Sequence, residues 1–401
     1  MSRCYGQTIS PKSPVITAIT AHPATFGTGR DTMSFFFVSV ETDAGIVGFG
    51  EACDSYGCSY ASVVQTLVDD VFAPLLIGQA VSAVEPLADR MRLFTRRRLG
   101  DQWVAVHARS SLELALWDIV GKSAQCSVSS LIGSVRDRVE VYASTVFLEE
   151  LSATQHIELL APLLDRGVKK IKLRVGPEWE ADLATLSEVR ALLGPHIQLM
   201  IDGSEIFTLP TARLMADALH ALHVQWFEEP LPQGNRAGIE ALVRQAPIPI
   251  AYGEHLFGAD EAIDAMRREQ LHVLQPDAST CGGLGEARRM AQAAAPFGVR
   301  VVPHVCAGPI SLAANLHLAA TVPAIRLIEY PPSMASAWAT FGRNCNFGPD
   351  AIVDGAIGIP SGLGLGVELD EAAVNTHPYQ PPGARVAGTI GGLPDRFVGD
   401  R

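Results

Sequence analysis

Short apolar runs in the second half of the chain end repeatedly in a single polar residue, at nearly equal spacing. From Asp202 onward the steps between these residues are 26, 26, 23, 27 and 25. A strand, a helix and two short loops need about 25 to 30 residues. Parallel strands that close into a barrel bring their C-terminal ends to one face. The spacing therefore predicts successive β/α units whose strand ends form an active-site rim, made by Arg174, Asp202, Glu228, Glu254, Asp277, His304 and Glu329.

The first third of the chain does not follow this rhythm. Alternating apolar patterns predict antiparallel strands over 15–22, 34–42 and 46–51, and helical spacing predicts helices over 60–76, 84–94 and 103–124. These elements indicate a separate α+β unit before the first barrel strand, the β-branched run 139–147. Beyond Glu329 we expect a loop over 355–367 and a short helix over 368–374.

Charge and cysteine usage restrict the partners and the compartment. The net charge of −12 argues against nucleic acid or an anionic membrane as a partner. No apolar run reaches the roughly 18 residues that span a bilayer, and the N-terminus lacks the apolar core of a signal peptide. The seven cysteines are odd in number and contain no CxxC pair. A cytoplasmic protein with reduced thiols is expected.

Three carboxylates at consecutive strand ends, Asp202, Glu228 and Glu254, predict a metal site. Like charges pointed at one space repel unless a cation lies between them. Oxygen ligands without Cys or His favour a hard divalent ion, and Mg²⁺ is the best match. Glu229, next to Glu228, is expected to face outward or to lie behind the ligand. The alternative is three unrelated acids in helix caps or surface ion pairs.

An acid–base set is predicted at the remaining strand ends. Lys172 and Arg174 alternate on one strand, so both point into the barrel or its mouth. Asp277 next to His304 would fix the imidazole tautomer and make His304 a general base or acid; the alternative is a structural histidine. Glu329 could hydrogen-bond a substrate carboxylate if neighbouring acids raise its pKa.

Together these residues predict a definite chemistry. A divalent ion polarises a carboxylate, a base removes the proton from its α-carbon, and metal and cations stabilise the enediolate that forms. Two polar, glycine-containing loops, 23–32 and 52–60, offer Arg30 and Tyr56 as contacts for the substrate, or are plain surface loops.

The ordered motifs resemble those of the enolase superfamily, in its mandelate racemase-like subgroup (the mandelate racemase/muconate lactonizing enzyme family). The resemblance covers nearly the whole chain. It rests on Lys172-Leu-Arg174-Val-Gly, Ile-Asp202-Gly-Ser, Trp-Phe-Glu228-Glu-Pro, Gly-Glu254-His, Gln-Pro-Asp277, Pro-His304, Ile-Glu329-Tyr and, near the start, Leu-Ala-Leu-Trp117-Asp118-Ile-Val-Gly-Lys122.

This resemblance implies an α/β fold, a modified TIM (β/α)7β barrel with an N-terminal α+β capping domain. The capping domain would span 1–135, with two mobile loops that close over the barrel at 136–352, and a C-terminal segment, 353–401, would return to it. The resemblance also implies Mg²⁺ on Asp202, Glu228 and Glu254, Lys172 on the substrate carboxylate, an Asp277–His304 dyad, and a homo-oligomer.

Two positions depart from the family pattern. Arg174 stands where the family usually has a second lysine as the opposite-face base, and a guanidinium stays protonated up to a pH of about 12. Two-base racemisation is therefore disfavoured. Ser204 stands where many relatives carry Asn. The candidate substrate-binding residues are Arg30, Tyr56, Ser204 and His255.

The favoured hypothesis is a Mg²⁺-dependent dehydratase that converts a sugar acid into a 2-keto-3-deoxy sugar acid. His304 would remove the α-proton and then help a β-hydroxyl leave. The second hypothesis is a racemase, epimerase or lactone cycloisomerase on the same scaffold. The third, from another class, is a non-catalytic sugar-acid binding protein.

Overall fold

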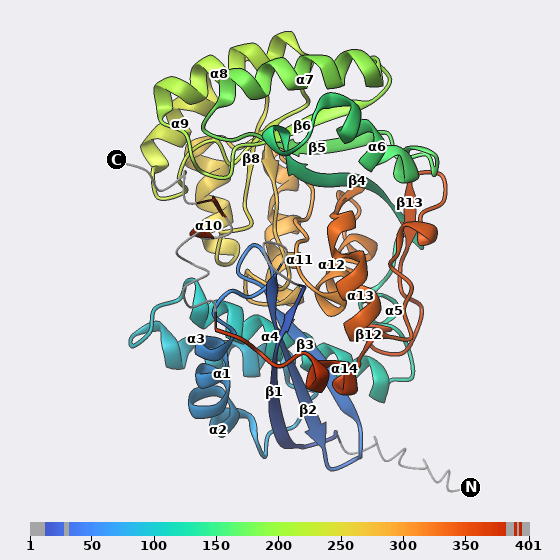
Figure 1. Cartoon of the computed structure of the whole chain (residues 1–401). Helices are drawn as coiled ribbons and strands as arrows, with labels where there is room; N and C mark the ends of the chain where they lie inside the picture. The colour runs from blue at the N-terminus through green and yellow to red at the C-terminus, as the bar shows by residue number, and fades with distance from the viewer. Residues whose placement is uncertain (1–12, 28–31, 382–388, 391–392, 395–401) are drawn as a thin grey trace, which may run out of the picture.

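The computed structural model describes residues 13–27, 32–381, 389–390 and 393–394 (Figure 1). Three antiparallel strands come first, β1 (Ile16–Phe26), β2 (Met33–Thr42) and β3 (Val47–Ala52), in the order β1-β2-β3. In β2 alternate residues face two different cores, because side chains of a strand point to opposite faces. Phe35 and Phe37 belong to the core that includes the barrel, whereas Phe36 and Val38 belong to a core with the first helices.

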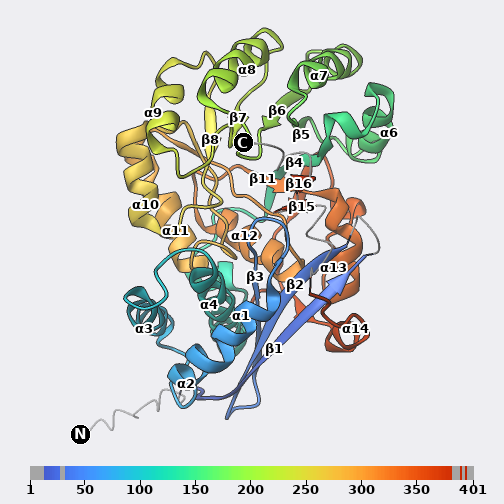
Figure 2. The ribbon, with the colours of Figure 1, turned by 60° about the vertical axis from the view of Figure 1, so that its left-hand side comes forward.

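Helices α1, α2 and α4 of this N-terminal unit pack on the three-stranded sheet (Figure 2), whereas α3 and α5 pack against α4. They are α1 (Ala61–Leu67), a π-helical turn (Val68–Phe72), α2 (Ala73–Leu76), α3 (Val84–Arg96), α4 (Val104–Ser123) and α5 (Val128–Ile132). The closest approach is that of α4 to β3. A Cβ added at Gly50 would lie 1.7 Å from the backbone oxygen of Ser111, so only glycine allows this contact. The predicted α+β arrangement is confirmed.

Eight parallel strands then form the barrel, in the order β10-β9-β8-β7-β6-β5-β4-β11. A hydrogen bond of 3.2 Å from the Glu329 N–H to the Pro303 carbonyl links the chain after β10 to β11, the other end of this series. The strands are β4 (Arg138–Phe147), β5 (Lys170–Arg174), β6 (Gln198–Asp202), β7 (Phe227–Glu228), β8 (Ile250–Tyr252), β9 (Val273–Leu274), β10 (Arg300–Val301) and β11 (Leu327–Tyr330).

Seven helices connect these strands, which confirms the predicted (β/α)7β order. They are α6 (Ala153–Leu164), α7 (Trp179–Leu193), α8 (Leu209–Ala221), α9 (Arg236–Gln245), α10 (Ala259–Asp264, continued as a π-helical turn over Ala265–Glu269), α11 (Leu284–Ala293) and α12 (Pro309–Thr321). The barrel interior is filled by one cluster of side chains from successive strands: Tyr142, Met200, Trp226, Ala251, Val273, Val302 and Leu327.

After β11 the chain continues through elements that the sequence pattern only partly indicated. They are α13 (Ala335–Phe341), β12 (Gly342–Arg343), β13 (Ala356–Gly358), β14 (Glu368–Leu369), α14 (Glu371–Thr376), β15 (Thr389–Ile390) and β16 (Leu393–Pro394), with short 3-10 turns at Pro332–Met334 and Pro349–Ala351. Two further 3-10 turns lie within the barrel, at Leu148–Glu150 and Ala295–Phe297. The predicted loop over 355–367 is wrong at β13, which pairs antiparallel with β4. Directly after α14, the His377 carbonyl accepts a hydrogen bond of 3.0 Å from the Thr25 N–H in β1.

Two acids of the N-terminal unit cap helices of the barrel. The Glu51 carboxylate on β3 accepts hydrogen bonds from the backbone N–H groups of Gly308 (2.5 Å) and Ser311 (2.9 Å) at the start of α12. The Glu113 carboxylate on α4 accepts from Leu284 (2.8 Å) and Gly285 (2.9 Å) at the start of α11. The first N–H groups of a helix have no partner within the helix, so these acids fasten the two units together.

Six cysteines lie in the part of the chain that the structure describes, and all six are free thiols. Within these same residues, no helix has the length and apolar character that crossing a membrane requires.

Candidate active site

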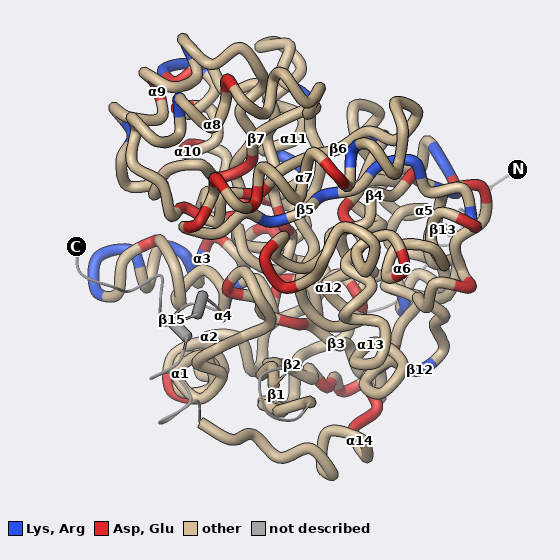
Figure 3. Tube along the Cα trace, turned by 45° about the horizontal axis from the view of Figure 1, so that its top comes forward, with Lys and Arg blue, Asp and Glu red and all other residues tan. Residues whose placement is uncertain are grey.

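The polar strand ends meet at one end of the barrel, facing the N-terminal unit. Acidic positions gather around the ends of β5 and β7 (Figure 3). Asp202 and Glu228 pair directly across β6 and β7, and Arg174 pairs with Asp202 across β5 and β6. Glu254, Asp277 and His304 follow β8, β9 and β10 within three residues. Regular β/α repeats thus bring residues that are distant in sequence into one cluster.

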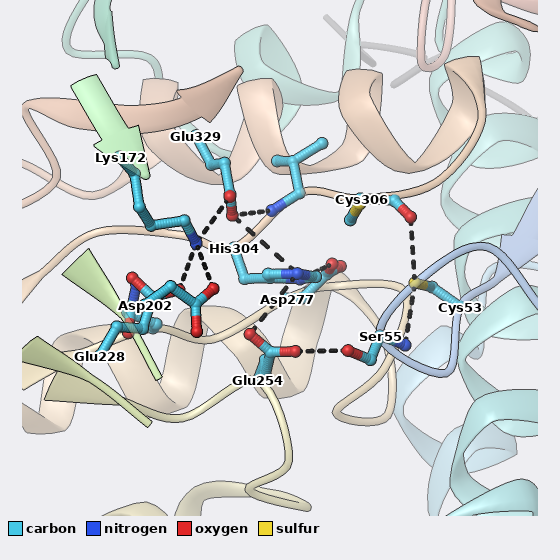
Figure 4. Close-up of polar contacts among 12 residues, drawn as sticks. Cys53, Ser55, Lys172, Asp202, Glu228, Glu254, Asp277, His304, Cys306 and Glu329 are labelled. Atoms are coloured by element: carbon cyan, nitrogen blue, oxygen red, sulfur yellow. Dashed lines mark hydrogen bonds and ion pairs between the residues drawn. The ribbon is translucent and has the colours of Figure 1, made fainter. Parts of the chain in front are cut away.

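Lys172 lies at the centre of this cluster and is fully buried (Figure 4). Its Nζ is 2.8 Å from Glu329 Oε1 and 3.3 Å from Asp202 Oδ2, and it also forms an ion pair with Glu228. Burial alone would lower the pKa of Lys172, but the charges of Glu228 and Glu329 outweigh it and raise the pKa well above the ordinary value. Lys172 is therefore a fixed cation among carboxylates.

Asp202 is held between two cations. Arg174 Nη1 lies 3.1 Å from Asp202 Oδ2. The other oxygen, Oδ1, accepts a hydrogen bond of 2.8 Å from the backbone N–H of Ser204. Burial raises the pKa of Asp202, but Arg174 and then Lys172 lower it by more, so the net shift is downward. Asp202 is an ionised carboxylate.

Glu228 is the third carboxyl group of the cluster, and it accepts two hydrogen bonds on one oxygen. Its Oε2 accepts hydrogen bonds from Gln275 Nε2 (2.7 Å) and Trp226 Nε1 (3.1 Å). Burial raises its pKa to about 7 in spite of Lys172, and the negative charges of Asp202 and Glu329 add to the rise. A further cation near Glu228 would remove this repulsion.

Glu254 faces the histidine of the predicted dyad. Its Oε2 is 3.5 Å from His304 Nε2, and its Oε1 accepts a 2.6 Å hydrogen bond from Ser55 Oγ. Ser55 belongs to the segment that follows β3, so a residue of the N-terminal unit directly contacts a strand-end acid of the barrel (Figure 4).

Asp277 and His304 form the predicted pair, both fully buried. Asp277 Oδ2 lies 3.0 Å from His304 Nδ1, which leaves Nε2 directed toward the cluster. The other oxygen of Asp277 accepts from the N–H (2.7 Å) and hydroxyl (2.6 Å) of Ser279 and from Asn315 (2.9 Å). Burial lowers the pKa of His304, but Glu254, Glu329 and Asp277 raise it to about 9.

Glu329 was expected to hydrogen-bond a substrate carboxylate on the condition that neighbouring acids raise its pKa. Burial does raise the pKa, but Lys172, His304 and Arg174 outweigh it and lower the pKa to about 2. Its Oε2 also accepts a hydrogen bond of 3.0 Å from the Val305 N–H. The condition is therefore not met in this structure, where Glu329 is an ion-pair partner of Lys172 at 2.8 Å.

A second group lies behind the first and was largely missed by the sequence analysis. Glu205, Glu229 and His255 have ligand atoms within 4.8 Å of one another and could hold a metal ion. Glu229 is buried and 3.2 Å from His255 Nδ1, so it does not face outward. Burial lowers the pKa of His255, but Glu229 and Glu205 raise it well above the ordinary value. His255 Nδ1 thus lies within ion-pair distance of both acids, 3.2 Å from Glu229 and 3.7 Å from Glu205.

The donor chemistry of the main cluster fits a hard cation better. Asp202, Glu228 and Glu254 are all buried. The atoms that they can offer to a metal ion are all carboxylate oxygens. Burial is the main cause of the raised pKa of Glu228, and the nearby acids Asp202, Glu329 and Glu254 add to it. Three residues beside the site, Ser204, Glu205 and Glu229, also adopt positive φ angles of 46°, 61° and 37°. Such backbone strain in non-glycine residues concentrates at functional sites.

The structure describes three of the four candidate substrate-binding residues. Arg30 lies outside the described residues. Tyr56 is 45% exposed, on the segment that carries Ser55. Ser204 and His255 contact Asp202 and Glu254, respectively. The sequence analysis also missed Ser55, Trp226 and Gln275. Trp226 and Gln275 each precede a predicted strand-end acid by two residues, the spacing that returns a strand side chain to the same face.

A capped parallel barrel with such an acid–base cluster at its strand ends defines an enolase-superfamily enzyme. Residues 156–373 match the family model described as enolase C-terminal domain-like. Residues 13–133 match the mandelate racemase/muconate lactonizing enzyme N-terminal domain. The chain belongs to the mandelate racemase/muconate lactonizing enzyme family of the enolase superfamily.

Several characterised relatives are similar over most of the chain. An arabinonate dehydratase of Saccharolobus solfataricus is 30% identical over 74% of this chain and 79% of its own. A D-galactarolactone cycloisomerase of Agrobacterium fabrum is 31% identical over 86% of this chain and 91% of its own. The crystal structure of the 3,6-anhydro-D-galactonate cycloisomerase from Zobellia galactanivorans is 27% identical, with a TM-score of 0.81, over 91% of this chain and 100% of that one.

Proposed function

We propose that this enzyme dehydrates a sugar acid to a 2-keto-3-deoxy sugar acid, with Mg²⁺ held by Asp202, Glu228 and Glu254. The observation that carries the proposal is the asymmetry of the cluster: a buried His304–Asp277 pair on one side, and Arg174 and Lys172 on the other. Dehydratases among the relatives support the same reaction class.

His304 supplies the proton transfers. Asp277 holds Nδ1, so in the neutral form of His304 it is Nε2 that takes the α-proton of the substrate. The electron pair of that C–H bond forms the new carbon–carbon double bond as the β C–O bond breaks. Protonated His304 can then return its proton to the departing hydroxide, which leaves as water. The enol product rearranges to the 2-keto acid.

Lys172 and Arg174 supply fixed positive charge and not a second base. Lys172 Nζ is enclosed by three carboxylates, and a guanidinium keeps its proton at all physiological pH values. Both cations favour the negative charge that develops on the substrate carboxylate. One base on one face suits an elimination, whereas racemisation needs a base on each face.

Mg²⁺, when bound, polarises the substrate carboxylate and so acidifies the α-proton. The all-oxygen, buried donor set of Asp202, Glu228 and Glu254 suits this ion. Ser204 and the backbone around it keep Asp202 in place, and Gln275 and Trp226 keep Glu228 in place. Such surrounding hydrogen bonds fix the orientation of ligands.

A screen of sugar acids with Mg²⁺, scored for 2-keto product, tests the proposal. A positive substrate should give water loss, and His304→Asn should abolish it while Mg²⁺ binding persists. Absence of 2-keto product from every acid, with α-deuterium exchange or an isomer of unchanged formula instead, would reject dehydration.

Lactone cycloisomerisation is the second candidate. It also needs one base and one acid. The D-galactarolactone cycloisomerase among the relatives favours it, and the similar 3,6-anhydro-D-galactonate cycloisomerase favours cycloisomerisation more generally. A lactone library discriminates the two reactions, because a cycloisomerase returns a product of the same mass as its substrate.

A further inference from the structure

We propose that Tyr142 is a positioning residue that holds Lys172 in its place in the acid–base cluster through the face of its aromatic ring. The inference rests on the role of Lys172 in the proposed function. Tyr142 is fully buried inside the barrel, and Lys172 Nζ lies over its ring, 5.7 Å from the ring centroid. A cation at such a distance is attracted to an aromatic face, and exclusion of water strengthens the attraction.

The strand register explains why the ring lies beneath the lysine. Tyr142 pairs with Glu329 across β4 and β11, and Ser144, two residues further along β4, pairs with Lys172 across β4 and β5. Residues two positions apart on a strand face the same side of the sheet. Tyr142 therefore lies one step below Lys172 in the barrel interior, with Glu329 beside it.

A second aromatic ring holds Tyr142 in this orientation. Trp226 meets Tyr142 edge to face, with the ring centroids 5.8 Å apart and the ring planes at 86°. Both side chains belong to the cluster that fills the barrel interior. The indole N–H of Trp226 donates 3.1 Å to Glu228 Oε2. The two rings thus form a floor under the acid–base cluster, with Tyr142 below Lys172 and Trp226 below Glu228.

The ring of Tyr142, and not its hydroxyl, makes the contact with Lys172. No residue in the described part of the chain forms a hydrogen bond with Tyr142 Oη. Burial raises the pKa of Tyr142 well above its ordinary value, so the hydroxyl stays neutral and adds no charge to the cluster. Phenylalanine at this position should therefore serve as well as tyrosine.

The contact with the ring gains importance when metal is bound. Lys172 Nζ forms ion pairs with Asp202, Glu228 and Glu329. In the proposed function Asp202 and Glu228 are ligands of Mg²⁺, and the ion then competes with Lys172 for their negative charge. Among the Nζ contacts of the described residues, those with Glu329 and with the ring of Tyr142 involve no metal ligand. These two contacts keep the ammonium group where it meets the substrate carboxylate.

The experiment compares full-length wild-type protein with Tyr142→Phe, Tyr142→Leu and a protein that carries a trifluorinated phenylalanine at position 142. Fluorine withdraws electron density from the ring, so this variant keeps the ring but weakens its attraction for a cation. Phe72→Leu, in the buried core of the N-terminal unit, is the control for a general loss of stability.

Two readouts are taken for each protein. Crystal structures give the position of Lys172 Nζ, which lies 2.8 Å from Glu329 Oε1 in the wild type. Steady-state kinetics on the substrate found by screening gives kcat and KM. The first readout does not depend on turnover, and the fluorinated protein keeps the ring volume if Tyr142→Leu does not fold.

Tyr142→Phe and Phe72→Leu should match wild type in both readouts. In Tyr142→Leu and the fluorinated protein, Nζ should move by about 1 Å, and kcat should fall about tenfold with a smaller change in KM. The larger effect on kcat is expected because fixed positive charge acts on the negative charge that develops in the transition state.

A wild-type Nζ position and kcat in the fluorinated protein would overturn the inference. An equal loss in Tyr142→Phe would assign the effect to the hydroxyl, and an equal loss in Phe72→Leu would assign it to stability, so either result would overturn it as well. A wild-type protein that makes an isomer would reject dehydration alone. If no acid is turned over, the crystal structures still decide whether the ring positions Lys172.

Discussion

Glu51 and Ser311 are joined by a hydrogen bond of 2.9 Å that crosses from the N-terminal unit to the barrel. The acceptor is a fully buried carboxylate and the donor is the backbone N–H in the first turn of α12. Burial raises the pKa of Glu51 to about 8, although the N–H groups of Ser311 and Gly308 act in the opposite direction. The contact between the two units is therefore sensitive to pH.

Comparison of wild type with Glu51→Gln tests this sensitivity. The folded carboxyl keeps its proton up to about pH 8, while the unfolded one releases it near 4.5. The folded state binds the extra proton between these values, so the contribution of Glu51 is full below 4.5 and is lost as pH rises through 8. Wild-type stability should fall by about 1.4 kcal/mol per pH unit relative to the variant, in urea unfolding. A pH-independent difference would contradict the assignment.

His304→Asn and Asp277→Asn test the acid–base pair. Removing the general base of the proposed reaction, His304, should lower kcat by about 10²- to 10⁴-fold. Asp277→Asn should lower kcat as well, since the amide no longer selects the Nδ1–H tautomer. His196→Asn, an exposed histidine, is the matched control. Steady-state kinetics on the substrate found by screening gives the result, and an active His304→Asn enzyme would exclude this residue as the base.

Arg174→Lys tests whether a side chain that can lose its proton would act as a base on the face of the substrate opposite His304. The lysine keeps positive charge beside Asp202 but can lose its proton, unlike the guanidinium. We expect increased α-deuterium exchange into recovered substrate in D₂O, together with slower dehydration. Arg174→Gln should show slow dehydration without the added exchange. Arg343→Lys, in a surface ion pair, controls for the substitution itself. Unchanged exchange in Arg174→Lys would mean that this position does not reach the α-carbon.

Removal of one ligand at a time distinguishes the two acidic groups. Glu228→Gln should abolish Mg²⁺ binding, because the main cluster then loses one of its three carboxylates. Glu205→Gln should retain binding, since Glu205 and Glu229 already have His255 as an ion-pair partner. In thermal unfolding, Mg²⁺ at about 100 times its Kd should stabilise a binding-competent protein by about 2.7 kcal/mol. The reverse pattern would place the ion at Glu205, Glu229 and His255.

The sequence was sufficient to predict the barrel and its central cluster, because both follow from a repeat. Each β/α unit ends its strand at the same face, so equal spacing places Asp202, Glu228 and the Asp277–His304 pair near one another. β13 could not be predicted in this way, since a strand of three residues is too short for alternation to be visible.

Properties that depend on contacts between distant segments also escaped prediction. The contact between Ser55 and Glu254 joins residues 199 positions apart, and no local pattern marks it. The direction of the Glu329 pKa shift could not be predicted, because it depends on the 2.8 Å approach of Lys172. Counting neighbouring acids cannot reveal that distance.

The capping of α11 by Glu113 and of α12 by Glu51 limits how this architecture can be divided. A fragment that begins at the first barrel strand would leave both helix ends without acceptors. A chimaera that takes its N-terminal unit from a relative needs an acid at each of the two positions to be inherited with it. The N-terminal unit can therefore be exchanged only together with both capping acids, even though the acid–base pair lies in the other unit.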